Sequence, residues 1–258
     1  MLKFATINVL AIATAIMIVL LHFFIETTLW YLLGIVLIWF VFTASGSGLI
    51  QWNYHLISLN SNPKTIKNQI AITFDDGPHP EFTLKTLMLL AKYNQKATFF
   101  CIGKNIVQFP NVFNQIIAEG HTVGNHTYNH AHNFGILKTK EVLSELRETT
   151  AIAYNASGLK MKLYRPAFGV TNPRIKRAVA ELKLQSIGWN KRSLDTTNRS
   201  EKVILKRITN NLKKGDVVLL HDSSEKSLKV LEQLLIFLKQ KKIASVTIDQ
   251  LFKIKAYA

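Results

Sequence analysis

The hydrophobic residues of this chain are concentrated near its N-terminus, where charged side chains are almost absent. From Phe4 to Gly46 the only charged residue is Glu26. The apolar residues form two segments, at about 4–24 and 29–43, and a bilayer core is crossed by roughly 20 such residues. We therefore predict that residues 1–46 form a membrane anchor of two transmembrane helices. A single long anchor or signal, or a soluble pair of apolar helices, is the alternative.

Beyond this anchor, short apolar runs alternate with amphipathic stretches. Residues 47–67 form a polar connection, which we predict to be a linker to a domain at residues 68–258. The apolar runs predict strands at 70–74, 97–102, 121–124, 163–165, 185–189, 217–220 and 244–248. The amphipathic stretches predict helices at 81–93, 112–119, 138–155, 173–182, 201–212 and 228–241.

Every predicted strand but the last is followed by a helix, which is typical of a parallel α/β arrangement. The strands are apolar throughout, as strands covered on both faces are. We predict a distorted (β/α) barrel of about seven parallel strands. An open doubly wound sheet also fits the pattern. In either fold, functional residues are expected at the carboxyl ends of the strands.

Polar or ionisable side chains follow five of the predicted strands. They are Asp75 with Asp76, His126 with His130, Arg165, Asp195 and His221. Because the carboxyl ends of parallel strands share one rim, these side chains are expected to lie together.

Three of these residues, Asp76, His126 and His130, have the composition of a catalytic metal site. Adjacent carboxylates such as Asp75 and Asp76 repel each other, and this repulsion raises the pKa of one of them unless a nearby cation keeps both ionised. One carboxylate and two imidazoles leave an open fourth position, as catalytic divalent sites do, and zinc is the typical ion. The spacing of the histidines aims both rings the same way if their segment turns helically.

Five segments resemble the motifs of the polysaccharide deacetylase family, which is the NodB-homology group or carbohydrate esterase family 4. In chain order they are Thr73–Pro78, His126–His130, Arg165–Gly169, Asp195 and Leu219–His221. The resemblance covers about residues 68–250. It implies metal-dependent hydrolysis of N-acetyl groups from a carbohydrate, such as an N-acetylglucosamine-type unit of a cell-envelope polysaccharide or glycolipid, with release of acetate.

The resemblance also implies a role for each matched residue. Asp76, His126 and His130 would hold the metal. Asp75 would be the general base, and His221 the general acid that protonates the departing amine. Arg165 would pair with Asp75, and Asp195 would pair with His221. The backbone N–H of Phe168 would donate to the oxyanion, and Leu219 would line a pocket for the acetyl methyl group.

This chain departs from the family pattern at two motifs. The third motif usually ends in Pro-Tyr-Gly, and Phe168 stands here in place of the tyrosine. In the fourth, Arg192 and Thr196 stand where the first Asp and the Trp would be, so the sugar-side wall of the groove differs. Trp189 is either a core residue or a platform on which a sugar stacks. Asp222 is expected to cap the helix that follows it.

The net charge of +16 belongs to the predicted domain, because the anchor contributes one Lys and one Glu. A basic surface attracts anions such as acidic glycans or phospholipid head groups, although it is also compatible with a merely solvated face. The sequence has no nucleic-acid-binding motif, so we expect an N-acetylated glycan and a membrane as partners, and no nucleic acid. The single cysteine, Cys101, leaves no intramolecular disulfide.

The location of the domain follows from the expected substrate. Lys3 mildly favours a cytoplasmic domain by the positive-inside rule, but a cell-envelope glycan places the domain in the periplasm or outside the cell, and we expect the latter. Two other functions remain possible, namely an amidohydrolase acting on another C–N bond and an inactive carbohydrate-binding module. The presence of both Asp75 and His221 argues against the module, because binding alone needs neither a base nor an acid.

Overall fold

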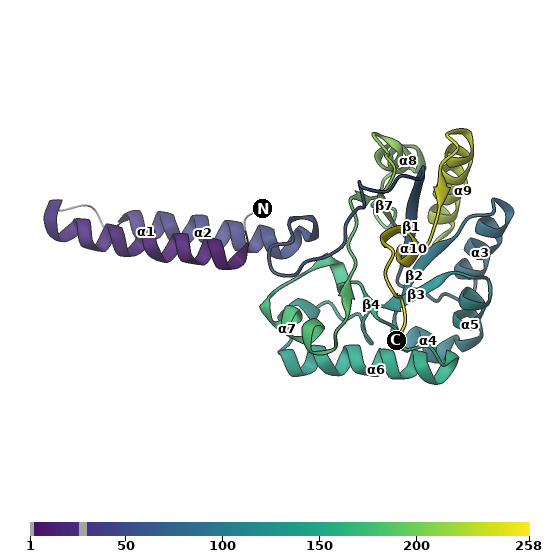
Figure 1. Ribbon diagram of the computed structural model, residues 1–258, viewed down its shortest axis with the longest axis horizontal. Helices are drawn as coiled ribbons and strands as arrows, with labels where there is room; N and C mark the ends of the chain where they lie inside the picture. The colour runs from purple at the N-terminus through teal and green to yellow at the C-terminus, as the bar shows by residue number, and fades with distance from the viewer. Residues whose placement is uncertain (1–2, 26–29) are drawn as a thin grey trace.

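The computed structural model describes residues 3–25 and 30–258, which form a helical hairpin and an α/β domain (Figure 1). Helices α1 (Phe4–Ile25) and α2 (Trp30–Gly48) pack side by side, and Trp39 Nε1 donates a hydrogen bond of 2.7 Å to Asn8 Oδ1 between them. By length and composition both helices can cross a membrane. The break between them was predicted at residues 22–28. Helix α1 includes residues 22–25 of this segment, and residues 26–28 lie outside the described residues.

The sheet of the domain contains seven parallel strands along one path and an eighth beside it. The path runs β5-β4-β3-β2-β1-β7-β6, and β8 pairs with the first residues of β1. The strands are β1 (Gln69–Asp75), β2 (Ala97–Cys101), β3 (Thr122–Asn125), β4 (Leu163–Tyr164), β5 (Gln185–Ser186), β6 (Lys191–Arg192), β7 (Val217–His221) and β8 (Ala244–Ser245).

Helices follow most strands, as the sequence pattern predicted. They are α3 (Phe82–Lys92), α4 (Gly103–Gln108), α5 (Pro110–Ala118), α6 (Thr139–Ser157), α7 (Pro173–Glu181), α8 (Glu201–Thr209), α9 (Glu225–Gln240) and α10 (Ile248–Phe252). Helices α4 and α10 were not predicted, because each is too short to show a helical period. The strand predicted at 185–189 ends at Ser186, and the two-residue strand β6 follows it.

The sheet curls into an incomplete barrel, which confirms the predicted distorted (β/α) barrel. Its two edge strands, β5 and β6, are separated in sequence by only residues 187–190. Because so few residues reach only a short distance, the two edges must lie near each other. The alternative of an open doubly wound sheet does not fit this arrangement.

Alternation along β1 divides the core between the two faces of the sheet. Ile70, Ile72 and Phe74 pack with the surrounding helices, whereas Ala71 belongs to a second cluster that includes Phe100, Leu163, Val217 and Leu219. Successive strand residues point to opposite faces. Asp75, the last residue of β1, therefore shares the face of Ala71, inside the barrel.

The segment predicted as a linker packs against the domain. Tyr54, Leu56 and Ser58 are buried. Ser58 Oγ lies 2.7 Å from Ser186 Oγ, and Leu59 pairs with Ile187 in a parallel bridge. The polar composition of the segment thus reflects hydrogen bonding to the barrel.

The base of the hairpin contacts both this segment and the domain. The carbonyl of Ser47, near the end of α2, accepts a hydrogen bond of 2.9 Å from the Thr171 N–H. Ser47 Oγ lies 3.0 Å from His55 Nε2, and the Phe4 ring lies 4.8 Å from the ring of His55. Figure 1 shows this base beside α7. The hairpin is therefore fastened to the loop that precedes α7.

Candidate active site

A cavity of about 250 Å³ opens at the carboxyl ends of the strands. It brings together eight of the residues predicted from the sequence, namely Asp75, Asp76, His126, His130, Phe168, Trp189, Leu219 and His221. The other two, Arg165 and Asp195, are fully buried and are bonded to Asp75 and His221 respectively.

The side chains of Asp76, His126 and His130 form a compact group at one wall of this cavity. The Nε2 atoms of His126 and His130 lie 3.4 and 3.5 Å from Asp76 Oδ1. A tetrahedral ion with ligands at roughly 2.0–2.1 Å would hold neighbouring ligand atoms about 3.3–3.4 Å apart. Asp76 Oδ1 is also buried and has no hydrogen-bond partner among the described residues. The three side chains therefore fit one divalent ion.

The hydrogen bonding of His126 selects the tautomer that a metal needs. His126 Nδ1 lies 3.0 Å from the carbonyl oxygen of Arg165. Because a carbonyl only accepts, Nδ1 carries a proton, so in the neutral ring it is Nε2 that presents a lone pair to the cavity. Such a bond to the distal nitrogen is typical of metal-binding histidines.

The electrostatics of the group also suit a cation. Burial opposes ionisation of Asp76, but the charges of His126, His221 and His130 outweigh it and lower the pKa of Asp76. Burial and the charge of His126 lower the pKa of His130 to about 4. Burial lowers the pKa of His126 too, but Asp75 and Asp76 outweigh this effect and raise it. An ionised carboxylate and a neutral imidazole both favour metal binding.

The two histidines do not lie on a helix. Thr127 and His130 have positive φ angles of 67° and 50°, so their segment is an irregular turn. Glu145 of α6 holds this turn by accepting the N–H groups of Tyr128 and Asn129 at 2.9 and 2.8 Å. The prediction that helical spacing aligns the rings is wrong in its mechanism, because the turn and not a helix brings them together.

Asp75 is held by a buried arginine. Arg165 NH1 donates to Asp75 Oδ1 at 2.8 Å and to Thr73 Oγ1 at 2.7 Å. Arg165 NH2 donates to the Gly188 carbonyl at 2.9 Å. A buried guanidinium is tolerated when its donors are satisfied and its charge is paired. Asp75 Oδ2 lies on the metal side of the carboxylate, 3.8 Å from His126 Nε2.

His221 is the partner of Asp75 in the parallel register of β1 and β7, and its ring is oriented by Asp195. Its Nδ1 lies 2.8 Å from Asp195 Oδ1, and its backbone N–H donates to Asp195 Oδ2 at 2.8 Å. Burial disfavours the imidazolium, but the bond to Asp195 and the charges of Asp195, Asp75 and Asp76 outweigh burial and raise the pKa of His221 to about 9. His221 Nε2 remains directed at the cavity, 3.9 Å from Asp76 Oδ2.

The apolar lining differs in exposure from residue to residue. Phe168 is 41% exposed and adopts a positive φ of 57°, and its ring lies 4.4 Å from that of His130. Leu219 and Trp189 are buried at 3% and 5% exposure. Trp189 belongs to the barrel core and also lines the cavity, so little more than its edge is available to a ligand.

Several supporting residues were not found from the sequence. Glu145 fixes the histidine turn, while Ser193 and Ser227 donate to Asp195 at 2.7 and 2.8 Å. No sequence signal marks them, because their contacts are formed only in the fold. The prediction for Asp222 is wrong. Ser224 caps α9, whereas Asp222 is buried, accepts a bond from Thr83 Oγ1 and has its pKa raised to about 7 by burial.

Known proteins resemble this chain across most of its length. The sequence model of a family described as polysaccharide deacetylase matches residues 62–187. A peptidoglycan-N-acetylglucosamine deacetylase of Bacillus cereus is 32% identical over 191 residues, which cover 72% of this chain and 69% of that protein. The chain belongs to the polysaccharide deacetylase family. A second relative, the peptidoglycan-N-acetylmuramic acid deacetylase PdaC of Bacillus subtilis, is 31% identical to this chain over 204 residues. The matched region covers 78% of this chain but only 43% of the length of PdaC.

Solved structures show the same fold for this polysaccharide deacetylase. A peptidoglycan N-acetylglucosamine deacetylase superposes with a TM-score of 0.71 at 33% identity, covering 77% of this chain and 94% of that one. A family 4 carbohydrate esterase from Streptomyces lividans, solved in complex with acetate, has a TM-score of 0.67 at 29% identity over 75% of this chain and 98% of that one.

Proposed function

We propose that this polysaccharide deacetylase hydrolyses the N-acetyl group of an N-acetylglucosamine-type unit in a cell-envelope glycan, releasing acetate and leaving a free amine. The observation that carries the proposal is the single cavity in which Asp76, His126 and His130 face both Asp75 and His221. Relatives described as peptidoglycan deacetylases support the substrate class.

Asp76, His126 and His130 would hold a divalent ion, and we propose zinc because one oxygen and two nitrogen ligands with an open position are typical of catalytic zinc. When bound, such an ion polarises the acetamide carbonyl and makes a water molecule more acidic. The remaining chemistry falls to the side chains around it.

Asp75 would act as the general base. Its Oδ1 is occupied by Arg165 NH1, so Oδ2 is the atom that takes the proton from the attacking water. The water oxygen forms a bond to the carbonyl carbon, and the proton stays on Asp75. The pairing with Arg165 keeps the carboxylate oriented while the base acts.

His221 would act as the general acid. An amine leaves poorly unless it is protonated, so the C–N bond breaks as His221 Nε2 gives its proton to the nitrogen. The bond from Nδ1 to Asp195 keeps the imidazole charged and directs Nε2 into the cavity. Base and acid are thus separate groups that would flank the reacting carbonyl.

The remaining lining would bind the acetyl group and the sugar. The backbone N–H of Phe168 would donate to the developing oxyanion. Leu219 would contact the acetyl methyl group, and the exposed edge of Trp189 the sugar. The positive φ of Phe168 costs free energy, so it persists only because the surrounding structure enforces it. Such strained residues are often found in functional loops.

The α1–α2 hairpin would anchor the enzyme in a membrane, with the domain in the periplasm or outside the cell. The length and apolar composition of both helices support two spans, and a cell-wall glycan as substrate supports the outer side. Because both ends of a hairpin lie on one side of the membrane, the domain and the base of the hairpin would share that side.

Acetate release tests the proposal directly. The full chain in detergent micelles would be stripped of metal with a chelator and assayed on an N-acetylglucosamine oligomer, before and after addition of zinc. We expect release only with the metal restored. Release of a different product from another amide would favour the amidohydrolase alternative, and glycan binding without turnover would favour the binding module.

A further inference from the structure

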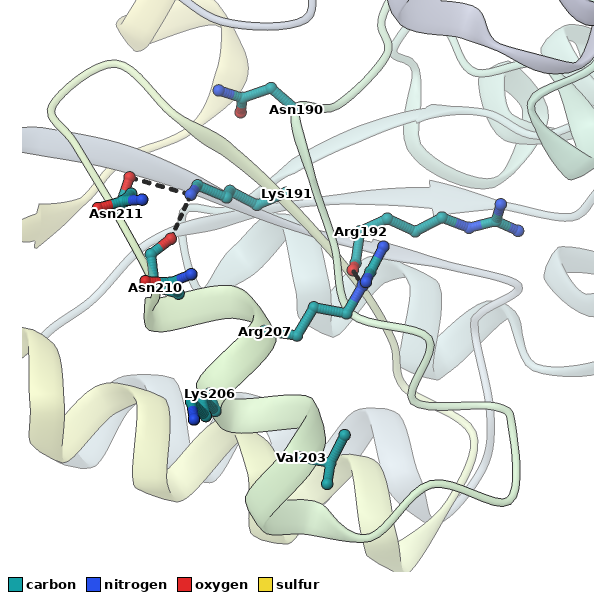
Figure 2. Close-up of a pocket in the computed structure, with 8 residues that line it drawn as sticks. All are labelled: Asn190, Lys191, Arg192, Val203, Lys206, Arg207, Asn210 and Asn211. Atoms are coloured by element: carbon teal, nitrogen blue, oxygen red, sulfur yellow. Dashed lines mark hydrogen bonds between the residues drawn. The ribbon is translucent and has the colours of Figure 1, made fainter.

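A second cavity lies next to the active site, between β6 and α8 (Figure 2). Its volume is about 530 Å³, and we refer to it as the α8 groove. Four of its lining residues are basic, namely Lys191, Arg192, Lys206 and Arg207, and most of the others are asparagines. No acidic side chain is among the residues that line it.

Two of the four basic side chains hold the groove in shape. Lys191 Nζ donates to the carbonyls of Asn210 and Asn211 at 2.6 and 2.9 Å, which fixes the end of α8. Arg207 Nε donates to the Arg192 carbonyl at 2.8 Å, which ties α8 to β6. The terminal nitrogens of Arg207 are left at the groove surface.

The positive charge of the groove is only partly neutralised nearby. Asp216 Oδ2 lies 3.9 Å from Lys191 Nζ, but in the described part of the chain no carboxylate pairs with Arg192, Lys206 or Arg207. The neighbouring acid Asp216 is buried and already accepts from Asn190 Nδ2 and the Lys213 N–H at 2.6 and 2.8 Å. Arg192, Lys206 and Arg207 are exposed. Clustered exposed cations create a local potential that attracts anions.

The groove adjoins the active site at Arg192, which lines both cavities. Its guanidinium carbon lies 5.9 Å from the ring of Trp189, and Figure 2 shows the side chain extending away from Lys191. Arg192 also stands where the fourth family motif often has an aspartate.

We propose that the α8 groove binds an anionic group, a carboxylate or a phosphate, carried by the glycan on a sugar next to the one being deacetylated. The proposal rests on the proposed function and narrows its substrate to anionic glycans. A guanidinium fork binds either group through paired hydrogen bonds. The groove would therefore select charged strands over neutral ones.

The test compares three N-acetylglucosamine oligomers of equal length, one neutral, one carrying carboxylates and one carrying phosphate monoesters on alternate sugars. The full chain with Lys206→Gln and Arg207→Gln is compared with the wild type. The matched control is Lys140→Gln with Lys229→Gln, which removes the same net charge from exposed positions on α6 and α9. Both KM for deacetylation and Kd from fluorescence anisotropy are measured.

We expect the groove variant to raise KM and Kd for one or both charged oligomers by about fivefold relative to the neutral oligomer, as the loss of two exposed cations predicts. The charged oligomer with the larger effect identifies the anion. Arg207→Lys keeps the charge but not the paired hydrogen bonds of the guanidinium, so it should lose less affinity than Arg207→Gln without reaching the wild type. Added salt should reduce the preference.

Equal changes for charged and neutral oligomers, or the same selective loss in the control variant, would overturn the proposal. The second result would mean that the overall field of the protein attracts the glycan and not the groove. If the wild type releases no acetate from any oligomer, the proposed function fails, and the anisotropy measurement still decides whether the groove binds anions.

Discussion

Asp75 and Asp76 are adjacent in sequence, yet both reach the same cavity. Consecutive residues of a strand point to opposite faces, so an extended backbone would direct one of them away. Asp76 avoids this with a positive φ of 75°, a conformation that is uncommon for residues other than glycine. The turn directs the Asp76 carboxylate to the imidazoles of His126 and His130, while the Asp75 carboxylate remains hydrogen-bonded to Arg165. One carboxylate can thereby bind metal while the other acts as the base.

The substitution Asp75→Asn tests this division. The amide oxygen of Asn can still accept from Arg165, so the fold and the three metal ligands should be preserved while the base is lost. We expect full zinc content with a kcat lower by about 10²–10⁴-fold, the range of general-base contributions. Zinc content by metal analysis and acetate release provide the measurements. The control, Asp76→Asn, should lose the metal itself, and normal turnover in Asp75→Asn would remove Asp75 from the mechanism.

The pairing of His221 with Asp195 predicts the pH dependence of the reaction. A general acid works in its protonated form, so activity should fall as pH rises through the pKa of His221, which the neighbouring carboxylates hold above its ordinary value. The substitution Asp195→Asn keeps an acceptor for Nδ1 but removes the negative charge. The pKa should fall by about one unit or more, and the alkaline limb of the kcat profile should move to lower pH. An unmoved limb would mean that another group is the acid.

Some of the elements that position these residues could be predicted from the sequence, and others could not. The strand ends that carry Asp75, His126 and His221 could be predicted, because parallel strands present their carboxyl ends at one rim. The turn at His126–His130 could not, since it depends on Glu145, a residue of α6 that is distant in sequence. Strand β6 was not predicted either, because two residues are too few to show a period. The α8 groove, which lies beside β6, was therefore not predicted.

The N-terminus of helix α7 is capped by residues of types that favour a helix start. Asn172 caps its first turn by accepting the N–H groups of Arg174 and Ile175, both at 2.9 Å, and Pro173 stands at the first helical position, where its missing N–H costs nothing. The helix directly follows the loop that contains Phe168. The cap therefore helps to hold that loop.

The substitution Asn172→Ala should lower the free energy of unfolding by about 1 kcal/mol, the usual cost of losing such a cap. This corresponds to a melting temperature lower by roughly 2–4 °C in a protein of this size, which a thermal melt in detergent would resolve. Asn172→Asp keeps the acceptor and suits the positive end of the helix dipole, so it should stay near the wild type. Equal losses in both variants would point instead to the Asn172 Nδ2 bond to the Gly135 carbonyl.

In the whole molecule, the α1–α2 hairpin and the domain meet at a packed junction. Gly46 of α2 is so close to the buried Tyr54 that a Cβ atom at this position would lie 2.3 Å from the Tyr54 ring. Ser47 accepts the Thr171 N–H, three residues from Phe168. The hairpin therefore supports the rim of the active site from outside, although every residue that lines the cavity comes from the domain.

This arrangement predicts separate effects for loss of the hairpin and loss of the junction. Residues 47–258 keep Ser47, Tyr54 and the complete cavity, so their kcat/KM on a soluble oligomer should stay within about twofold of the full chain, as for changes away from a site, while sedimentation with lipid vesicles is lost. Residues 56–258 lack the junction and leave the Thr171 N–H without Ser47, so their activity should fall further. Thermal melts of both pieces would show that each folds. Collapse of activity in residues 47–258, with folding intact, would mean that the hairpin itself completes the site.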